Sequence, residues 1–329
     1  MKDKAMQVGR MSLDSVKKFR FSVVNTQVTL VLALVILGVV FSTLSPVFFS
    51  VRNFLNVGIS SSILGIMATG LTVAMLLGGL DISQYSVAAF AGLLTAVLLK
   101  AGSSIPVALL AVLACGVVLG GINGLIITRM RINPIITTLG TSLIFRSLAF
   151  IMTSGRYIAI DNEVMNYIGR GYFLGVPNAI WFMIFVYAIF YYMLKYTAFG
   201  RKIYAVGGNA DASFLSGINV KKIRFQAFMI SGIMAALAGL MMSAQVSAGM
   251  PTAGEGAELD VIVAVILGGI SLSGGKGKIL GTLLGVLILA VLKNGLTLLS
   301  VQAFYQMLIR GLVLILAVFL DTLRGGGYR

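Results

Sequence analysis

Five polar residues lie within or beside long apolar stretches, where a charge or an amide is costly. Arg146, Lys293 with Asn294, and Arg310 fall inside apolar runs, and Asp81 follows a glycine pair at the end of another. An ionisable side chain at membrane depth usually faces a bundle interior or a water-filled path. We therefore predict that these five residues line a path for a polar solute. The alternatives are an interhelical clamp for the two arginines and snorkelling for Lys293.

Asp81 allows two interpretations. It lies in the segment 78–83, GGLDIS, where two glycines loosen the end of an apolar run. Aspartate is a good N-cap, so Asp81 could cap the helix that follows. The second interpretation is a broken helix that lines the pathway.

Residues for enzymatic chemistry are missing. The chain has no histidine and one cysteine, Cys115, so the commonest general base and zinc ligand are excluded. The segment 274–278, GGKGK, departs from a phosphate-binding loop, because Gly277 follows Lys276 where Ser or Thr is required. We predict no enzyme activity, no cofactor and no metal site, and we place any ATP hydrolysis in a partner protein.

The segment 200–224 is polar, basic and too long for a tight connection. It joins two apolar halves, and we predict that it receives an energy input from a partner protein. Residues 210–215 can form a short helix, with Asn209 as its N-cap and Gly217 as its C-terminal stop. Phe214, Leu215 and Ile218 could then insert into a groove on that partner.

Composition sets the class of protein. The 329 residues are 58% hydrophobic and 11% charged, with a mean hydropathy of +1.01. A soluble domain averages roughly 25% charged residues. Too few polar side chains remain to cover a soluble globule, so the chain is predicted to be a polytopic membrane protein. The net charge of +15 does not indicate nucleic acid, because the basic residues punctuate apolar runs and form no single patch.

We predict an all-α fold with about ten membrane-spanning helices. Segments of roughly 17–25 apolar residues can cross a bilayer. The expected spans are 28–49, 57–78, 84–100, 105–128, 134–154, 178–196, 224–249, 258–272, 277–300 and 303–320. Residues 1–27 are expected to be a cytoplasmic tail, residues 28–329 a single transmembrane domain, and residues 197–223 its cytoplasmic loop.

The distribution of basic residues orients the chain. With the N-terminus inside, 18 of the 25 Lys and Arg residues lie on the inner side, four on the outer side and three within spans. This bias matches the positive-inside rule. We therefore expect both chain ends and the segment 200–224 in the cytoplasm.

Two short matches indicate an internal repeat. The sequence GIMA occurs at 65–68 and again at 232–235, and IFRSL at 144–148 resembles LIRGL at 308–312. Both offsets fit a five-plus-five arrangement, and an odd number of spans per half makes the second half inverted in the membrane. Glycines also recur every fourth residue at 116, 120 and 124 and at 277, 281 and 285. That spacing predicts tight helix packing within the chain, or alternatively a subunit interface or a sliding surface.

The outer loop 250–260 carries Glu255, Glu258 and Asp260 and no basic residue. It could contact a docking protein or a polar solute, or it could be an ordinary solvated loop.

Several stretches in order resemble permease subunits of ATP-binding-cassette importers for ribose and related monosaccharides. They are GGLDIS at 78–83, TLG at 138–140 with Arg146, TAFG at 197–200, AVGGN at 205–209, SGINV at 216–220, ELD at 258–260 and GGISLSGGKG at 268–277. The resemblance runs over roughly residues 30–320. Gln84 and Tyr85 depart from it, because the family usually continues GGLDIS with Val-Gly.

The resemblance implies a transport subunit in a prokaryotic inner membrane. It implies a cytoplasmic ATPase docked on short coupling helices, an extracytoplasmic sugar-binding protein, and a homodimer or a dimer with a paralogue. The alternative function is an ion-coupled secondary transporter of a small polar solute. Residues assigned to the contact with the ATPase are Gly200, Arg201, Gly208, Asn209, Asp211, Phe214, Leu215, Ser216, Gly217 and Ile218.

Overall fold

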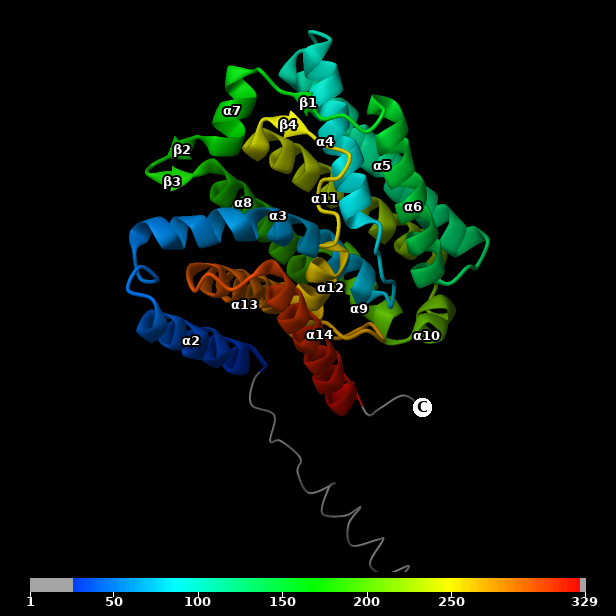
Figure 1. Cartoon of the computed structure of the whole chain (residues 1–329). Helices are drawn as coiled ribbons and strands as arrows, with labels where there is room; N and C mark the ends of the chain where they lie inside the picture. Colours follow the sequence, from blue (N-terminus) through cyan, green and yellow to red (C-terminus); the bar gives the residue numbers. More distant parts are fainter. Residues whose placement is uncertain (1–25, 326–329) are drawn as a thin grey trace, which may run out of the picture.

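The computed structural model describes residues 26–325, and these residues are mainly helical (Figure 1). Ten apolar helices correspond to the ten predicted spans. They are α2 (Thr26–Leu44), α3 (Val51–Leu76), α4 (Gln84–Lys100), α5 (Ile105–Arg129), α6 (Pro134–Thr153), α8 (Asn178–Tyr196), α11 (Val220–Val246), α12 (Glu258–Leu267), α13 (Ile279–Leu298) and α14 (Ala303–Gly325). The predicted tail, 1–27, lies outside the described residues except for its last two, which begin α2.

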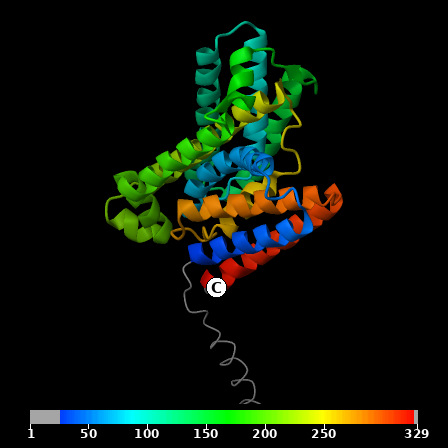
Figure 2. The same cartoon turned by 90° about the vertical axis from the view of Figure 1, so that its left-hand side faces the viewer.

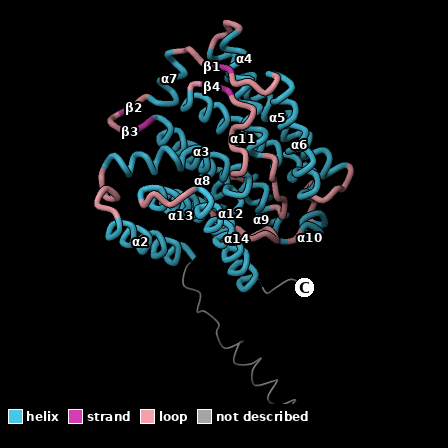
Figure 3. Tube along the Cα trace, viewed as in Figure 1, coloured by secondary structure: helices cyan, strands magenta, loops and turns pink. Residues whose placement is uncertain are grey.

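The shorter elements lie in the connections, as the loop colouring of Figure 3 shows. The helix α7 (Glu163–Arg170) and the strands β1 (Ile158–Ala159), β2 (Tyr172–Phe173) and β3 (Val176–Pro177) fill the connection between α6 and α8. The helices α9 (Ala198–Gly208) and α10 (Ala210–Leu215) fill the connection between α8 and α11. The strand β4 (Ala248–Gly249) follows α11 and pairs antiparallel with β1. The strands β2 and β3 form a hairpin.

The prediction of an all-α polytopic chain is confirmed, and several boundaries are corrected. Seven of the described helices are long and apolar enough to cross a membrane, and α4 and the segment 303–319 of α14 are shorter apolar helices. The predicted span 258–272 is wrong at its end, because α12 stops at Leu267 and glycines 269, 274, 275 and 277 take positive φ angles in the segment that follows. The count of ten spans and the inverted repeat stay predictions.

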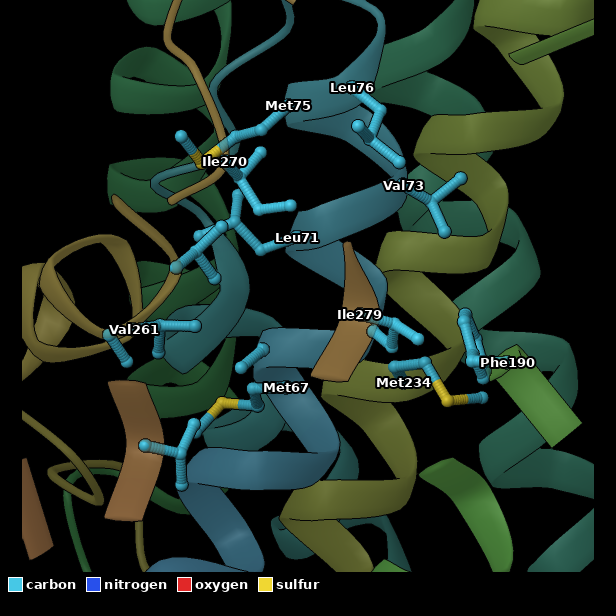
Figure 4. Close-up of a cluster of buried hydrophobic side chains, with 14 of the residues drawn as sticks. Met67, Leu71, Val73, Met75, Leu76, Phe190, Met234, Val261, Ile270 and Ile279 are labelled. Atoms are coloured by element: carbon cyan, nitrogen blue, oxygen red, sulfur yellow. The ribbon is translucent and has the colours of Figure 1, made fainter. Parts of the chain in front are cut away.

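The core is organised around α3 and α11. Most of α3 from residue 61 onward is buried, and α11 packs against α3, α4 and α5. Figure 4 shows Met67 and Leu71 of α3 in one cluster with Phe190 of α8, Met234 of α11 and Val261 of α12. Such interdigitated packing holds membrane helices together where lipid supplies no hydrophobic driving force.

Glycines bring α5 and α11 into backbone contact. A Cβ atom at Gly116 would lie 2.7 Å from the carbonyl oxygen of Gly232, and Gly120 and Gly124 pack against α11 as closely. Their spacing therefore marks tight packing within the chain. In the second set, Gly281 and Gly285 pack α13 on α12, whereas Gly277 lies in the loop before α13.

The ends of the helices gather on two opposite sides of the molecule. Figure 1 places α9 and α10 on one side and α7 with β2 and β3 on the other. Hydrogen bonds join the connections of the first side, as from Gly275 to the end of α3, and the strand pair β1–β4 joins those of the second. Figure 2 shows α2, α13 and α14 layered at one end of the bundle, where α2 contacts α13.

Candidate coupling surface and polar interior

The segment 197–219 is helical, and its first helix, α9, was not predicted. Thr197 caps α9, since its hydroxyl oxygen accepts a hydrogen bond of 3.1 Å from the amide of Gly200. Ile203 and Val206 are buried, while Arg201 and Lys202 are exposed. The segment as a whole is polar, so the amphipathic pattern of α9 was not recognised from the sequence. The helix α11 begins at Val220, within the predicted loop 197–223.

The helix α9 contacts both α3 and the glycine-rich loop 268–278. Gly207 lies against the carbonyl oxygen of Leu76 and the amide of Gly275, and that amide donates a 2.8 Å hydrogen bond to the same Leu76 oxygen. The hydroxyl of Tyr204 donates to the carbonyl of Gly277 at 3.0 Å. Burial raises the pKa of Tyr204 above its ordinary value, so the hydroxyl stays protonated and remains a donor. The GGKGK sequence is thus a packing contact for α9.

The short helix α10 has the predicted limits. The side chain of Asn209 accepts a 2.9 Å hydrogen bond from the amide of Ala212, and Gly217 follows the helix with φ near 81°. Phe214 and Leu215 are 70% and 85% exposed. Two large apolar side chains held outward on a capped helix form a surface suited to a groove on another protein.

The other residues assigned to the contact with the ATPase lie around these two side chains. Arg201, Gly208, Asn209, Asp211, Ser216 and Gly217 are exposed, Ile218 is partly buried, and Gly200 is buried against the end of α8. We call the exposed part of α9 and α10 the coupling surface. Gly200 contributes to it only by seating α9 on α8.

Asp81 lies in the irregular segment 77–83 and is 3% exposed. One carboxylate oxygen accepts hydrogen bonds from the amide and hydroxyl of Ser83, at 3.0 and 2.6 Å. The other accepts the hydroxyl of Ser231 on α11 at 2.6 Å. The N-cap residue of α4 is Ser83, so the prediction of Asp81 in that position is wrong. Asp81 instead braces the break between α3 and α4, where irregular backbone is tolerated because protein surrounds it.

A buried polar network extends from Asp81 across three more helices. Asn123 on α5 donates to the hydroxyl of Ser83 at 2.9 Å and accepts from Thr141 on α6 at 2.6 Å. Gln84 donates to Ser231 at 2.9 Å and to a backbone carbonyl of α3. Sequence reasoning missed these partners. Their signal was the occurrence of small polar residues inside apolar spans, which often bond across helices.

Arg146 on α6 reaches the connection between α11 and α12. Its guanidinium donates to the carbonyls of Pro251 and Ala253 at 2.8 and 2.7 Å, and lies 3.6 Å from the carboxylate of Glu258. The side chain is 13% exposed. This geometry fits the interhelical clamp, since the guanidinium binds two backbone carbonyls and also lies near one carboxylate.

Arg310 on α14 reaches the same segment from another side. It donates to both carboxylate oxygens of Asp260, at 3.1 and 2.9 Å. The structure therefore brings Arg146 and Arg310 together on the segment 250–260, although 164 residues separate them. Among the residues whose side chains the structure describes, these are the two ion pairs. Two acidic residues of the predicted outer loop are thus partners of arginines.

Lys293 and Asn294 have separate surroundings. Asn294 on α13 exchanges two side-chain hydrogen bonds with Asn53 on α3, at 2.8 and 3.0 Å. Lys293 is exposed. Neither residue contacts Asp81. Lys293 lies near enough to Asp260 for its charge to act on that carboxylate, so it belongs with Arg310 and not with Asn294.

The described residues show helices of membrane-spanning length, a polar interior and an amphipathic segment presented on one side. Among residues 26–325, no three His, Cys, Asp or Glu side chains gather as metal ligands would. A helical bundle with these features is that of a multi-pass membrane protein.

The chain belongs to the family described as branched-chain amino acid transport system / permease component, whose model matches residues 53–318. It is 43% identical to the ribose import permease protein RbsC of Haemophilus influenzae over 89% of this chain and 92% of that protein. It is 42% identical to RbsC of Escherichia coli K12, over 88% and 92%. It is 38% identical to the L-arabinose ABC transporter permease protein AraH of Azospirillum brasilense, over 87% and 85%. No solved structure matches the chain.

Family membership makes the chain a transport subunit, not an enzyme, and a multi-pass protein of the inner membrane. It does not favour the ion-coupled secondary transporter.

Proposed function

We propose that this protein is the permease subunit of an ATP-driven importer for a monosaccharide, a ribose-like pentose or a related sugar. A separate cytoplasmic ATPase drives it, and an extracytoplasmic binding protein delivers the sugar. Both chain ends and the coupling surface face the cytoplasm. The single observation that carries the proposal is the 43% identity to a ribose import permease over nearly the whole of both chains.

The coupling surface supports the role of the ATPase. Phe214 and Leu215 are exposed on α10, and α9 continues from it into contacts with α3 and the loop 268–278. A partner that holds α10 therefore acts on both halves of the bundle through α9. We propose that nucleotide-driven closure of a pair of ATPases moves these segments in a homodimer, or in a dimer with a paralogous permease.

We propose that the solute enters at the segment 250–260, on the side of the molecule opposite to the coupling surface. Arg146 and Arg310 hold this segment against α6 and α14. Breaking these contacts would release the two guanidinium groups and their acceptors next to the interior of the bundle. We therefore place Arg146 and Arg310 near the solute path. Asp81, Lys293 and Asn294 remain proposed path residues. In this structure the side chains of Asp81 and Asn294 hydrogen-bond to those of Ser231 and Asn53.

The test is uptake of labelled ribose by proteoliposomes containing the permease, its ATPase and its binding protein. We expect uptake to require all three proteins and ATP, and to survive an ionophore. Uptake that persists without the ATPase but collapses with the ionophore would refute the proposal. A thermal-shift screen of the binding protein against pentoses, hexoses and polyols identifies the sugar.

A further inference from the structure

A cavity of about 970 Å³ opens on the side of the molecule that carries α9 and α10. It lies among the end of α3, the turn between α5 and α6, α10, and the start of α11. Three basic side chains, Arg131, Lys221 and Arg224, line it together with one acidic side chain, Asp211. The lining thus carries two more positive than negative charges.

The basic groups of this cavity have no carboxylate partner within residues 26–325, since the ion pairs there are those of Arg146 and Arg310. The Nε atom of Arg224 is buried and makes no hydrogen bond to any described residue. A buried guanidinium nitrogen without an acceptor is costly. An acceptor supplied by a ligand would remove that cost.

Two helix N-termini reach the same cavity. Asn133 and Pro134 at the start of α6, and Asn219 and Val220 at the start of α11, are part of its lining. The N-terminus of a helix of 20 or 27 residues carries partial positive charge and favours an anion. The electrostatic preference of the helix ends therefore adds to that of the basic side chains.

Part of the remaining lining is apolar, and this selects among anions. Ile127, Ile132, Phe214, Ile218 and Phe228 form much of the wall. Beside the cavity, Met130, Ile135 and Ile136 are exposed at the turn between α5 and α6, as expected for side chains that face lipid. A ligand that combines a phosphate with apolar chains fits this surface better than free phosphate.

We propose that the cavity binds the phosphate of an acidic phospholipid, with Arg131 and Arg224 as the principal contacts and the apolar wall against the upper part of the acyl chains. The inference rests on the orientation proposed above, which puts the cavity at the cytoplasmic leaflet, where basic pockets between helices bind anionic headgroups. The bound lipid would join α10, through the neighbouring Phe214, to the turn between α5 and α6.

The experiment measures thermal unfolding of the full chain in neutral detergent. Dioctanoyl phosphatidylglycerol, dioctanoyl phosphatidylcholine and inorganic phosphate are added separately at equal concentrations. We expect phosphatidylglycerol at about ten times its Kd to raise Tm by about 3 °C. Phosphatidylcholine and inorganic phosphate should each raise it by less than about a third of that.

Variants locate the effect. Arg224→Gln and Arg131→Gln, made singly, should lose most of the shift caused by phosphatidylglycerol. Lys202→Gln, an exposed basic residue of α9 outside the cavity, should keep it. Native mass spectrometry of the same proteins should count fewer retained phosphatidylglycerol molecules for the cavity variants.

Three outcomes overturn the proposal. They are equal shifts from the two lipids, an equal shift from inorganic phosphate, and an undiminished shift in both cavity variants. If one variant does not fold, the other variant and the lipid comparison on the unmodified chain still decide. None of these measurements uses sugar, ATP or the ATPase, so failure here is separable from failure of the importer proposal.

Discussion

The guanidinium of Arg310 on α14 lies 2.9 Å from a carboxylate oxygen of Asp260 on the first turn of α12. Arg146 holds the preceding residues of the same segment from α6. Because α6 and α14 approach from different sides, the segment 250–260 is fixed at two points. Its position should therefore depend on both arginines.

The ion pair of Arg310 and Asp260 should contribute measurably to stability. Arg310→Gln and Asp260→Asn should each lower Tm, and the double variant should lose less than the sum of the two, by about 1 kcal/mol, because the groups are in direct contact. A thermal double-mutant cycle in detergent measures this coupling. Arg156→Gln, an exposed arginine of the neighbouring connection, is the control. Strict additivity of the two losses would contradict the prediction.

Phe214→Asp should uncouple ATP hydrolysis from uptake. The side chain is 70% exposed on α10, so the change should leave membrane insertion and Tm nearly unaltered while placing a charge where an apolar groove is expected. Uptake by the assembled importer should fall at least about tenfold if the lost contact is worth 1.4 kcal/mol or more. Ala205→Asp, at an exposed position of α9, should have a smaller effect. Normal uptake by the Phe214 variant would exclude the docking role.

Gly207 and its neighbour Gly208 provide a matched pair of positions for alanine substitution. A Cβ atom at Gly207 would collide with the backbone of Leu76, whereas one at Gly208 meets nothing within 4 Å. Gly207→Ala should displace α9 from α3 and lower both Tm and uptake, with a stability loss of about 1–3 kcal/mol. Gly208→Ala should preserve Tm, because the added methyl group meets nothing within the chain. Equal behaviour of the two variants in thermal unfolding would mean that α9 is not seated as described.

Asp81→Asn tests the buried polar network. The carboxylate accepts three hydrogen bonds on two oxygens, and an amide can accept on only one of its two terminal atoms. The hydrogen bond that the Ser231 hydroxyl donates to the carboxylate is then lost, and we expect a destabilisation of about 1–3 kcal/mol. Ser231→Ala should produce a smaller loss, and Ser42→Ala, whose hydroxyl bonds only its own helix, should produce almost none. An unchanged Tm for Asp81→Asn would indicate that the bonds to Ser83 alone hold the segment.

Local signals predicted local structure well. The limits of α10 followed from Asn209 and Gly217, because capping and positive φ are decided by the nearest residues. The ten apolar helices followed from hydropathy. The early end of α12 was missed, although the glycine pair at 268–269 is a local stop signal and Gly269 has a φ of 87°. The close packing of Gly268 against Gly281 of α13 could not be predicted, because it depends on the fold.

The polar contacts could not be predicted, because they depend on tertiary arrangement. Arg146 was recognised as unusual, but its acceptors lie 105 and 107 residues away. For Asp81 the sequence left a cap and a broken helix open, and it gave no sign of the hydroxyl 150 residues distant that binds the carboxylate. In both cases the residue type indicated that a partner exists, and only the fold identified which one.

The backbone contact between α5 and α11 limits how the protein can change shape. Sliding one of these helices along the other would drive the chain at Gly116, Gly120 and Gly232 into steric overlap. We therefore expect α5 and α11 to move together as one rigid unit. Displacement during a transport cycle then falls to helices outside this pair, among them α2, α6 and α14.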